Sequence, residues 1–148
     1  MKVLILSPYP QEIFKTLKKS NEKFIVSSHK LDMWFLNKHK IVLIISFGYK
    51  YIILKNIIDI FKNKIINLHI SYLPFNKGYY PNLWSHLEGS PSGISIHKID
   101  KGIDTGAVLV QRKIFFNIYK HSFKTSYEIL KRELIDLFCE NCNLLKGN

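Results

Sequence analysis

Short apolar runs alternate with amphipathic segments through the first half of the chain. Runs rich in β-branched residues predict strands, and apolar residues three or four positions apart predict helices that bury one face. The predicted strands are 3–7, 24–27, 41–47 and 65–70, and the predicted helices are 11–20, 31–37 and 52–62. This alternation is typical of an α/β fold with a mostly parallel central sheet flanked by helices.

The second half begins with a segment, 71–93, in which Pro, Gly, Tyr, Asn and Trp are frequent. Residues 83–88 within it are expected to form one or two helical turns. Alternating patterns then predict two strands, 94–99 and 107–114, on either side of a loop at 100–106.

Apolar residues recur every three or four positions over 125–145 and predict one long amphipathic helix. Its apolar side is expected to pack on the sheet of the same chain or on a partner subunit, which leaves a homodimer open. Neither repeats nor a linker interrupt the pattern, so residues 1–148 are expected to form a single domain.

The chain is strongly basic, with 22 Lys and Arg against 11 Asp and Glu and a net charge of +11. A positive surface attracts anions, either nucleic acid or a small anionic substrate. Only two of the basic residues, Arg112 and Arg132, are the arginines favoured in bidentate contacts to bases and phosphates. We therefore expect an anionic small molecule as the partner, and a nucleic-acid binder is the less favoured alternative.

Several common classes of protein are disfavoured. No uncharged apolar run approaches the roughly 18 residues of a membrane span, which predicts a cytoplasmic protein without a membrane partner. The chain lacks a glycine-rich dinucleotide loop, a Walker loop and a GxSxG elbow. Cys139 and Cys142 are expected to be reduced thiols, and the histidines lack metal-binding spacing, so no metal is expected.

The most informative polar groups are Asn67 and His69, two positions apart in the strand pattern IINLHI. They project to one face near the carboxyl end of that strand, where open α/β sheets build their sites. The segment DKGIDTG adds the carboxylates of Asp100 and Asp104 in a tight turn. An amide, an imidazole and a carboxylate are what acyl transfer requires, although polar core groups bonded to a neighbouring loop would give the same pattern.

The segments NLHISYLP, at 67–74, and GISIHKIDKGIDTGAVL, at 93–109, closely resemble the motifs of the 10-formyltetrahydrofolate-dependent formyltransferase family. The resemblance extends over about 41–114 and implies a Rossmann-like formyltransferase catalytic domain. The intervening PFNKGYYPNLWSHLEGSP, at 74–91, is most similar to short members linked to amino-sugar modification. The resemblance implies 10-formyltetrahydrofolate as the formyl donor.

The resemblance assigns roles to three catalytic residues. Asn67 would stabilise the oxyanion that forms when an amine attacks the formyl carbon. His69 would hydrogen-bond the same oxygen or carry the proton from the amine, and Asp104 would hold His69 in its useful protonation state and help to accept that proton through a water. His97 matches a frequent family histidine and is expected to support the aspartate loop, and Ser71 to tie the turn after the strand.

The family places the pterin of the folate between the aspartate loop and the segment after the preceding buried strand, whose backbone would read the pterin edge. The corresponding cofactor-binding residues are Phe47, Gly48, Tyr49, Ile52, Ile99, Asp100, Gly102 and Ile103. For Ile52 and its neighbour Ile53, membership of a helix core is the alternative.

A cluster beyond the catalytic strand is the expected contact for a nucleotide base or a sugar. Its members are Tyr79, Tyr80, Asn82 and Trp84. The alternative is that buried rings hold this loop in place.

The resulting hypothesis is an N-formyltransferase that moves a formyl group from 10-formyltetrahydrofolate to the primary amine of a nucleotide-linked amino sugar. Alternatives are a formyltetrahydrofolate deformylase, a glycinamide ribonucleotide or methionyl-tRNA formyltransferase-like enzyme, and a non-catalytic folate-binding module. The part before residue 41 is short for the family. One helix follows the last strand, so we expect no additional C-terminal domain of the kind that tRNA-formylating members carry.

Overall fold

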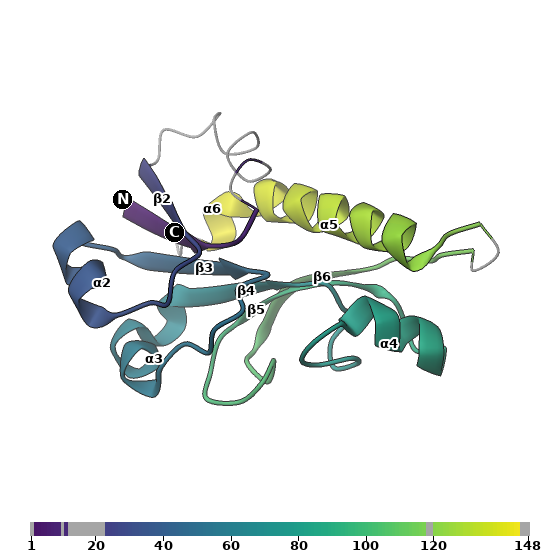
Figure 1. Ribbon diagram of the computed structural model, residues 1–148, viewed down its shortest axis with the longest axis horizontal. Coiled ribbons are helices and arrows are strands. Elements are labelled where there is room, and N and C mark those ends of the chain that lie inside the picture. The colour runs from purple at the N-terminus through teal and green to yellow at the C-terminus, as the bar shows by residue number, and fades with distance from the viewer. Residues whose placement is uncertain (1, 10, 12–22, 118–119, 146–148) are drawn as a thin grey trace.

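The computed structural model describes residues 2–9, 11, 23–117 and 120–145. These residues form a six-stranded sheet with the strand order β2-β1-β3-β4-β5-β6 (Figure 1). The strands are β1 Lys2–Leu6, β2 Lys23–Ser27, β3 Leu43–Phe47, β4 Ile65–His69, β5 Gly93–Lys98 and β6 Val108–Lys113. The first four run parallel, whereas β5 is antiparallel to β4 and β6 to β5. The predicted α/β fold with a mostly parallel sheet is confirmed.

Helices cover both faces of the sheet (Figure 1). The helical segments are α2 Met33–His39, α3 Lys55–Phe61, the 3₁₀ turn η1 Lys62–Lys64, α4 Pro81–Glu88, α5 Phe123–Glu140 and α6 Cys142–Leu145. The helix predicted at 11–20 lies outside the described residues apart from Gln11. Among the helices that the structure describes, none combines the length and apolar character needed to cross a membrane.

Two hydrophobic clusters lie on the two sides of the sheet, since successive side chains of a strand point to opposite faces. In β1, Val3 and Ile5 belong to the cluster that includes α5, whereas Leu4 and Leu6 belong to the cluster with α2 and α3. Burial on both faces explains the continuous apolar runs of the parallel strands.

The predicted single helix over 125–145 is wrong in one respect, because the chain forms α5 and α6 with Asn141 between them. The Asn141 side chain donates from Nδ2 to the Leu137 carbonyl oxygen at 2.8 Å, a local bond that competes with helix continuation. Ser122 caps the start of α5 by accepting from the Thr125 N–H at 3.2 Å. The apolar side of α5 packs on β4 and β5 of the same chain, which was one of the two expected alternatives.

α3 begins later than predicted, because Leu54 has an extended backbone and occupies the N-cap position. Ile53, just before it, is buried in the core, as its alternative interpretation expects. Its neighbour Ile52 is 83% exposed and therefore presents an apolar side chain to solvent.

Candidate active site

Asn67 and His69 lie on β4 with Leu68 between them, so their side chains project to the same face of the sheet. Ile66 and Leu68 point the other way, into the core around α5. On the neighbouring strand β5, His97 lies opposite Asn67. This alternation packs Ile66 and Leu68 in the core on one face of β4 and places Asn67 and His69 on the other, beyond the buried Ile65.

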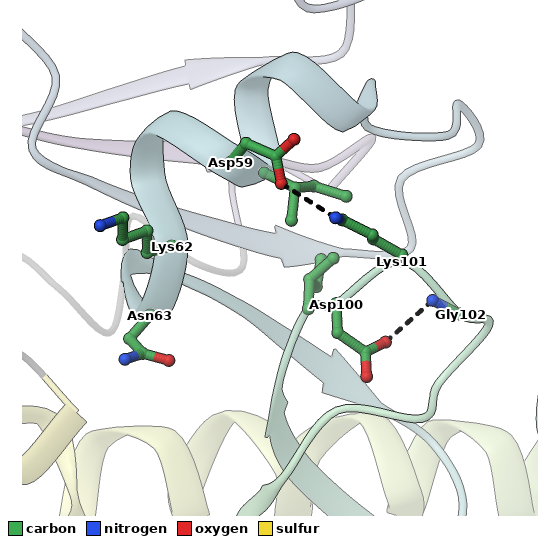
Figure 2. A pocket seen from close by; sticks show the side chains of 8 residues that line it. Asp59, Lys62, Asn63, Asp100, Lys101 and Gly102 are labelled. Carbon is green, nitrogen blue, oxygen red and sulfur yellow. Dashed lines mark hydrogen bonds and ion pairs between the residues drawn. The ribbon is translucent and has the colours of Figure 1, made fainter.

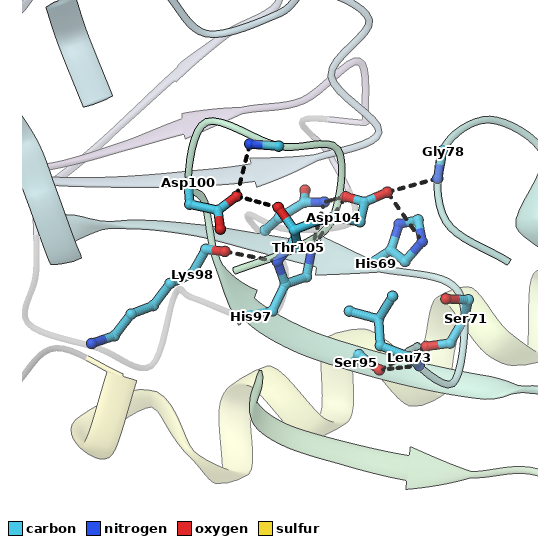
Figure 3. Close-up of polar contacts among 12 residues, drawn as sticks. His69, Ser71, Leu73, Gly78, Ser95, His97, Lys98, Asp100, Asp104 and Thr105 are labelled. Carbon is cyan, nitrogen blue, oxygen red and sulfur yellow. Dashed lines mark hydrogen bonds and ion pairs between the residues drawn. The ribbon is translucent and has the colours of Figure 1, made fainter. Parts of the chain in front are cut away.

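The loop between β5 and β6 places Asp104 next to His69, as Figure 3 shows, and next to Asn67. Asp100 stabilises the loop, because its Oδ1 accepts from the Gly102 N–H at 3.0 Å and from the Thr105 hydroxyl at 2.6 Å. A Cβ at Gly106 would lie 1.8 Å from the last carbonyl oxygen of β5, so only glycine permits this approach. Within the loop, Asp104 has a left-handed backbone with a φ of 50°.

The Asp104 carboxylate contacts both Asn67 and His69, and Figure 3 shows it next to His69. Its Oδ2 lies 3.5 Å from His69 Nε2, and its Oδ1 accepts from Asn67 Nδ2 at 3.3 Å. Oδ2 also accepts from the backbone N–H of Gly78 at 2.8 Å. The structure thus brings together Asn67, His69 and Asp104, which we call the trio.

His97 is buried and lies directly beside the trio. Its Nδ1 is 2.8 Å from the Lys98 carbonyl oxygen, and because a carbonyl only accepts, Nδ1 carries the proton. Its Nε2 lies 3.2 Å from Asn67 Nδ2 and 3.4 Å from Asp104 Oδ1. These contacts are consistent with the supporting role expected of His97.

The surroundings of Asp104 and His69 lower the pKa of both groups, and this determines their protonation states at neutral pH. Burial raises the pKa of Asp104, but the contacts with His97, His69 and the Gly78 amide outweigh burial and lower the pKa to about 2. Burial lowers the pKa of His69, and the charge of Asp104 and the Asn76 carbonyl compensate only in part. At neutral pH Asp104 is therefore ionised and His69 is neutral and able to take up a proton.

Backbone groups of the segment after β4 complete the site. The Asn76 carbonyl oxygen lies 3.3 Å from His69 Nε2, the ring nitrogen that also faces Asp104. Ser71 ties the start of this segment by donating to a carbonyl oxygen four residues later at 2.9 Å. Sequence reasoning missed the contacts of Asn76 and Gly78, because backbone groups leave no signal in side-chain identity. Gly78 was a signal that the sequence did contain, because its φ of 86° is a backbone conformation that favours glycine.

The aromatic residues of the predicted substrate cluster are exposed. Tyr79 and Tyr80 are 71% and 74% exposed, and Trp84 is 46% exposed. The alternative in which buried rings hold the loop is therefore wrong for these three side chains. The Tyr79 hydroxyl donates to the Lys50 carbonyl oxygen at 3.2 Å, so the loop reaches the segment that follows β3.

Asn82 differs from the aromatic residues and needs a correction. Its side chain is buried and donates from Nδ2 to the Phe123 carbonyl oxygen at 3.1 Å and to the Ser126 hydroxyl at 3.0 Å. These bonds connect α4 to the first turn of α5. Asn82 therefore has a structural role, and its side chain is not available to a substrate.

A cleft of about 500 Å³ separates α3 and η1 from the start of the aspartate loop (Figure 2). Its lining includes three of the predicted folate contacts, Ile99, Asp100 and Gly102, together with Lys101. The opposite wall was not predicted, since it depends on how α3 packs; its residues are Ile58, Asp59, Lys62 and Asn63. Lys101 crosses the cleft to pair with Asp59 at 3.4 Å.

The other predicted folate contacts do not line this cleft. The Phe47 side chain is buried in the core, so only its backbone remains for a ligand. The Tyr49 hydroxyl accepts from the Leu31 N–H and donates to the His29 carbonyl, both at 2.9 Å. Gly48 is exposed with a φ of 64°, and the apolar side chains of Ile52 and Ile103 are exposed as well.

The two cysteines lie outside the trio, at the junction of α5 and α6. Both are free and half-buried. Burial and the neighbouring Cys142 and Asp136 raise the pKa of Cys139 to about 11, so it is a thiol at neutral pH. Across the described residues, no group of three or more His, Cys, Asp or Glu side chains is arranged to hold a metal ion.

Residues 11–133 match the sequence profile of the formyl transferase family, so the chain belongs to that family. Methionyl-tRNA formyltransferase from Finegoldia magna is 36% identical over 127 residues, which cover 85% of this chain and 32% of that protein. A dTDP-4-amino-4,6-dideoxyglucose formyltransferase from Mycobacterium tuberculosis is 28% identical over 74 residues, which cover 49% of this chain and 32% of that protein. The chain thus spans about a third of the length of these curated relatives.

The fold is shared with solved formyltransferase structures. The formyltransferase PseJ from Anoxybacillus kamchatkensis, in complex with UDP-4,6-dideoxy-4-formamido-L-AltNAc and tetrahydrofolate, superposes with a TM-score of 0.91 at 41% identity, covering 99% of this chain and 77% of that one. Phosphoribosylglycinamide formyltransferase from Bacillus halodurans superposes with a TM-score of 0.82 at 16% identity, covering 100% and 96%. The second likeness concerns the fold alone.

Proposed function

We propose that this chain is a catalytic domain that transfers a formyl group from 10-formyltetrahydrofolate to the primary amine of a nucleotide-linked amino sugar. The observation that carries the proposal is the Asp104 carboxylate, which contacts both Asn67 and His69 at the carboxyl end of β4. An ionised carboxylate, a neutral imidazole and an amide donor together provide proton acceptance and stabilisation of a developing oxyanion.

Each member of the trio has a distinct task. Asn67 Nδ2 directs its two hydrogens at Asp104 Oδ1 and His97 Nε2, and one of them would turn to the oxygen on which negative charge develops during attack. The neutral His69 accepts the proton that the attacking amine must lose and delivers it to the folate nitrogen as the bond between that nitrogen and the formyl carbon breaks. Asp104 stabilises the resulting imidazolium across 3.5 Å, and its low pKa keeps it ionised throughout.

The cleft beside α3, which we call the folate cleft, supports folate as the formyl donor. Ile58 and Ile99 provide apolar walls for a flat ring, while Asp59 and Asn63 offer acceptors for its amino and ring N–H groups. When bound, the donor supplies the formyl carbon that the amine attacks.

The acceptor class is supported by the likeness to PseJ, whose complex contains a UDP-linked formamido sugar. The basic character of the chain also favours an anionic acceptor. The second candidate is a methionyl-tRNA acceptor, which the likeness to methionyl-tRNA formyltransferases favours. The two candidates share the trio and differ in the acceptor alone.

The test measures tetrahydrofolate formation from 10-formyltetrahydrofolate, with and without UDP- and dTDP-linked amino sugars. We expect turnover only with an amino sugar. Asp104→Asn should lose this turnover, whereas the matched control Asp136→Asn, whose carboxylate is exposed on α5, should retain it. Formation of tetrahydrofolate without any amine would instead indicate a deformylase. Turnover that requires methionyl-tRNA would establish the second candidate.

A further inference from the structure

A second hollow lies on the other side of the trio from the folate cleft. It has a volume of about 320 Å³ and is lined by Asn76, Lys77, Trp84 and Glu88, and we call it the acceptor hollow. α3 and α4 lie on opposite sides of the loop between β5 and β6 (Figure 1). Two hollows thus flank the trio, as a reaction between two substrates requires.

Lys77 and Trp84 give the acceptor hollow the chemistry of a nucleotide site. Lys77 is exposed, and within the part of the chain that the structure describes it forms no ion pair. The Trp84 ring is nearly half exposed, although core packing usually buries an indole more completely. An ammonium group binds phosphate oxygens, and an exposed aromatic face stacks on a nucleobase.

Hydrogen bonds hold the walls of the acceptor hollow in place. Asn76 donates from Nδ2 to Glu88 Oε2 at 3.3 Å and accepts from the Ser90 hydroxyl at Oδ1 at 2.7 Å. These bonds join the loop after β4 to the end of α4. The Glu88 carboxylate retains acceptor capacity, which suits the hydroxyl groups of a ribose.

Backbone groups of the segment that borders the acceptor hollow contact the trio. The backbone carbonyl of Asn76 lies 3.3 Å from His69 Nε2, and the N–H of Gly78 donates to Asp104. Figure 3 shows Gly78 and Asp100 on opposite sides of Asp104. A ligand in the hollow therefore lies on the same segment that contacts both His69 and Asp104.

The folate cleft is a poorer site for a diphosphate. It contains two carboxylates, Asp59 and Asp100, against the single Glu88 of the acceptor hollow, and carboxylates repel phosphate. Its Lys101 is already paired with Asp59 at 3.4 Å (Figure 2). Among the described residues each hollow has one lysine without an ion pair, Lys62 or Lys77, but of the two only the acceptor hollow also has an exposed aromatic ring in its lining.

We propose that the acceptor hollow binds the nucleoside diphosphate part of the acceptor, with the base stacked on Trp84 and the diphosphate at Lys77. This inference rests on the proposed function and adds the residues that recognise the nucleotide. It extends the predicted substrate cluster to Lys77 and Glu88, which the aromatic pattern did not indicate.

The test uses Trp84 as the reporter. The chain has two tryptophans, so Trp34→Phe leaves Trp84 as the single indole fluorophore. Titration of this variant with UDP, in the absence of folate, is expected to quench the fluorescence saturably. Adding Lys77→Ala should weaken UDP binding about tenfold, the size expected for one charged contact. The matched control is Lys30→Ala, an exposed lysine between β2 and α2, which should leave binding unchanged.

A calorimetric titration of UDP provides a second readout that does not depend on fluorescence. Trp84→Ala should weaken UDP binding about tenfold, whereas Trp84→Phe should largely retain it, because stacking needs only an aromatic face. Absence of quenching in a folded protein, or equal affinities of the Lys77 and Lys30 variants, would overturn the proposed site. These titrations contain no folate and are therefore independent of the turnover assay. UDP binding here, combined with no formyl transfer to UDP- or dTDP-linked amino sugars in that assay, would contradict the proposed function and leave the nucleotide site standing.

Discussion

Asp104 Oδ2 lies 3.5 Å from His69 Nε2, and the two residues come from a loop and a strand that only the fold brings together. The same oxygen accepts from the Gly78 N–H at 2.8 Å. Asp104 is therefore held from two sides while it faces the imidazole. The contact places a fixed negative charge next to the group that is expected to gain a proton.

Replacement of Asp104 by Asn should lower turnover by about 100-fold or more, because the amide keeps the shape but cannot stabilise an imidazolium by charge. Steady-state kinetics with the amino-sugar acceptor measure the loss, and circular dichroism checks that the fold is retained. Activity close to that of the unmodified protein would remove Asp104 from the mechanism.

The pH dependence of turnover should reflect His69. Because burial lowers the pKa of this imidazole below the ordinary 6.5, the neutral form that accepts a proton persists to lower pH. We expect kcat/KM to fall on the acid side with a midpoint below 6.5. A midpoint above 6.5 in the pH profile would show that a different group controls the reaction.

Stability should also depend on Asp104. Its pKa is lowered in the folded state from 3.8 to about 2, so its stabilising contribution is complete above the unfolded value and is lost as the pH falls from 3.8 toward 2. Discounted for partial exposure, the contribution is about 1–2 kcal/mol. Urea unfolding at about pH 5 and about pH 3 should show a smaller stability loss for Asp104→Asn than for the unmodified protein. Equal losses would contradict the low pKa.

The hydrogen bond between Thr105 and Asp100 should affect catalysis through the position of Asp104. Thr105→Val removes the hydroxyl but keeps the shape, and we expect kcat to fall about tenfold with little change in KM. Thr105→Ser restores the hydroxyl and should restore kcat. If the Val and Ser variants were equally active, the bond would have no part in positioning the loop.

Asn82→Ala should destabilise the protein without changing acceptor affinity. The substitution leaves the buried Ser126 hydroxyl without two of its bonds, at a cost of about 1–3 kcal/mol. Chemical denaturation measures this loss, and the KM for the acceptor should stay the same. A raised KM with unchanged stability would return Asn82 to the substrate site.

Residue spacing was sufficient to predict the sheet and the common face of Asn67 and His69, because the period of a strand is two. Spacing could not place the backbone groups of Asn76 and Gly78, which contact the trio without any contribution from their side chains. Nor could it show that Asn82 turns toward α5, since that depends on how two helices pack.

The wall that α3 contributes to the cleft beside the aspartate loop could not be predicted from the sequence either. Ile58 and Asp59 lie on a helix whose apolar positions only indicated core packing. They face the aspartate loop because α3 packs beside it (Figure 2). Local patterns report which face of an element is apolar, whereas a cleft is defined by two elements at once.

The most direct test of the central claim follows the formyl carbon itself. The protein is mixed with 10-formyltetrahydrofolate labelled in the formyl group and with a UDP-linked amino sugar, and the products are analysed by mass spectrometry. We expect the label in a formamide on the sugar nitrogen, formed about 100-fold more slowly or less with Asp104→Asn. Label recovered only as formate, or label transfer at the same rate in the Asp104 variant, would contradict an amine-directed transfer by the trio.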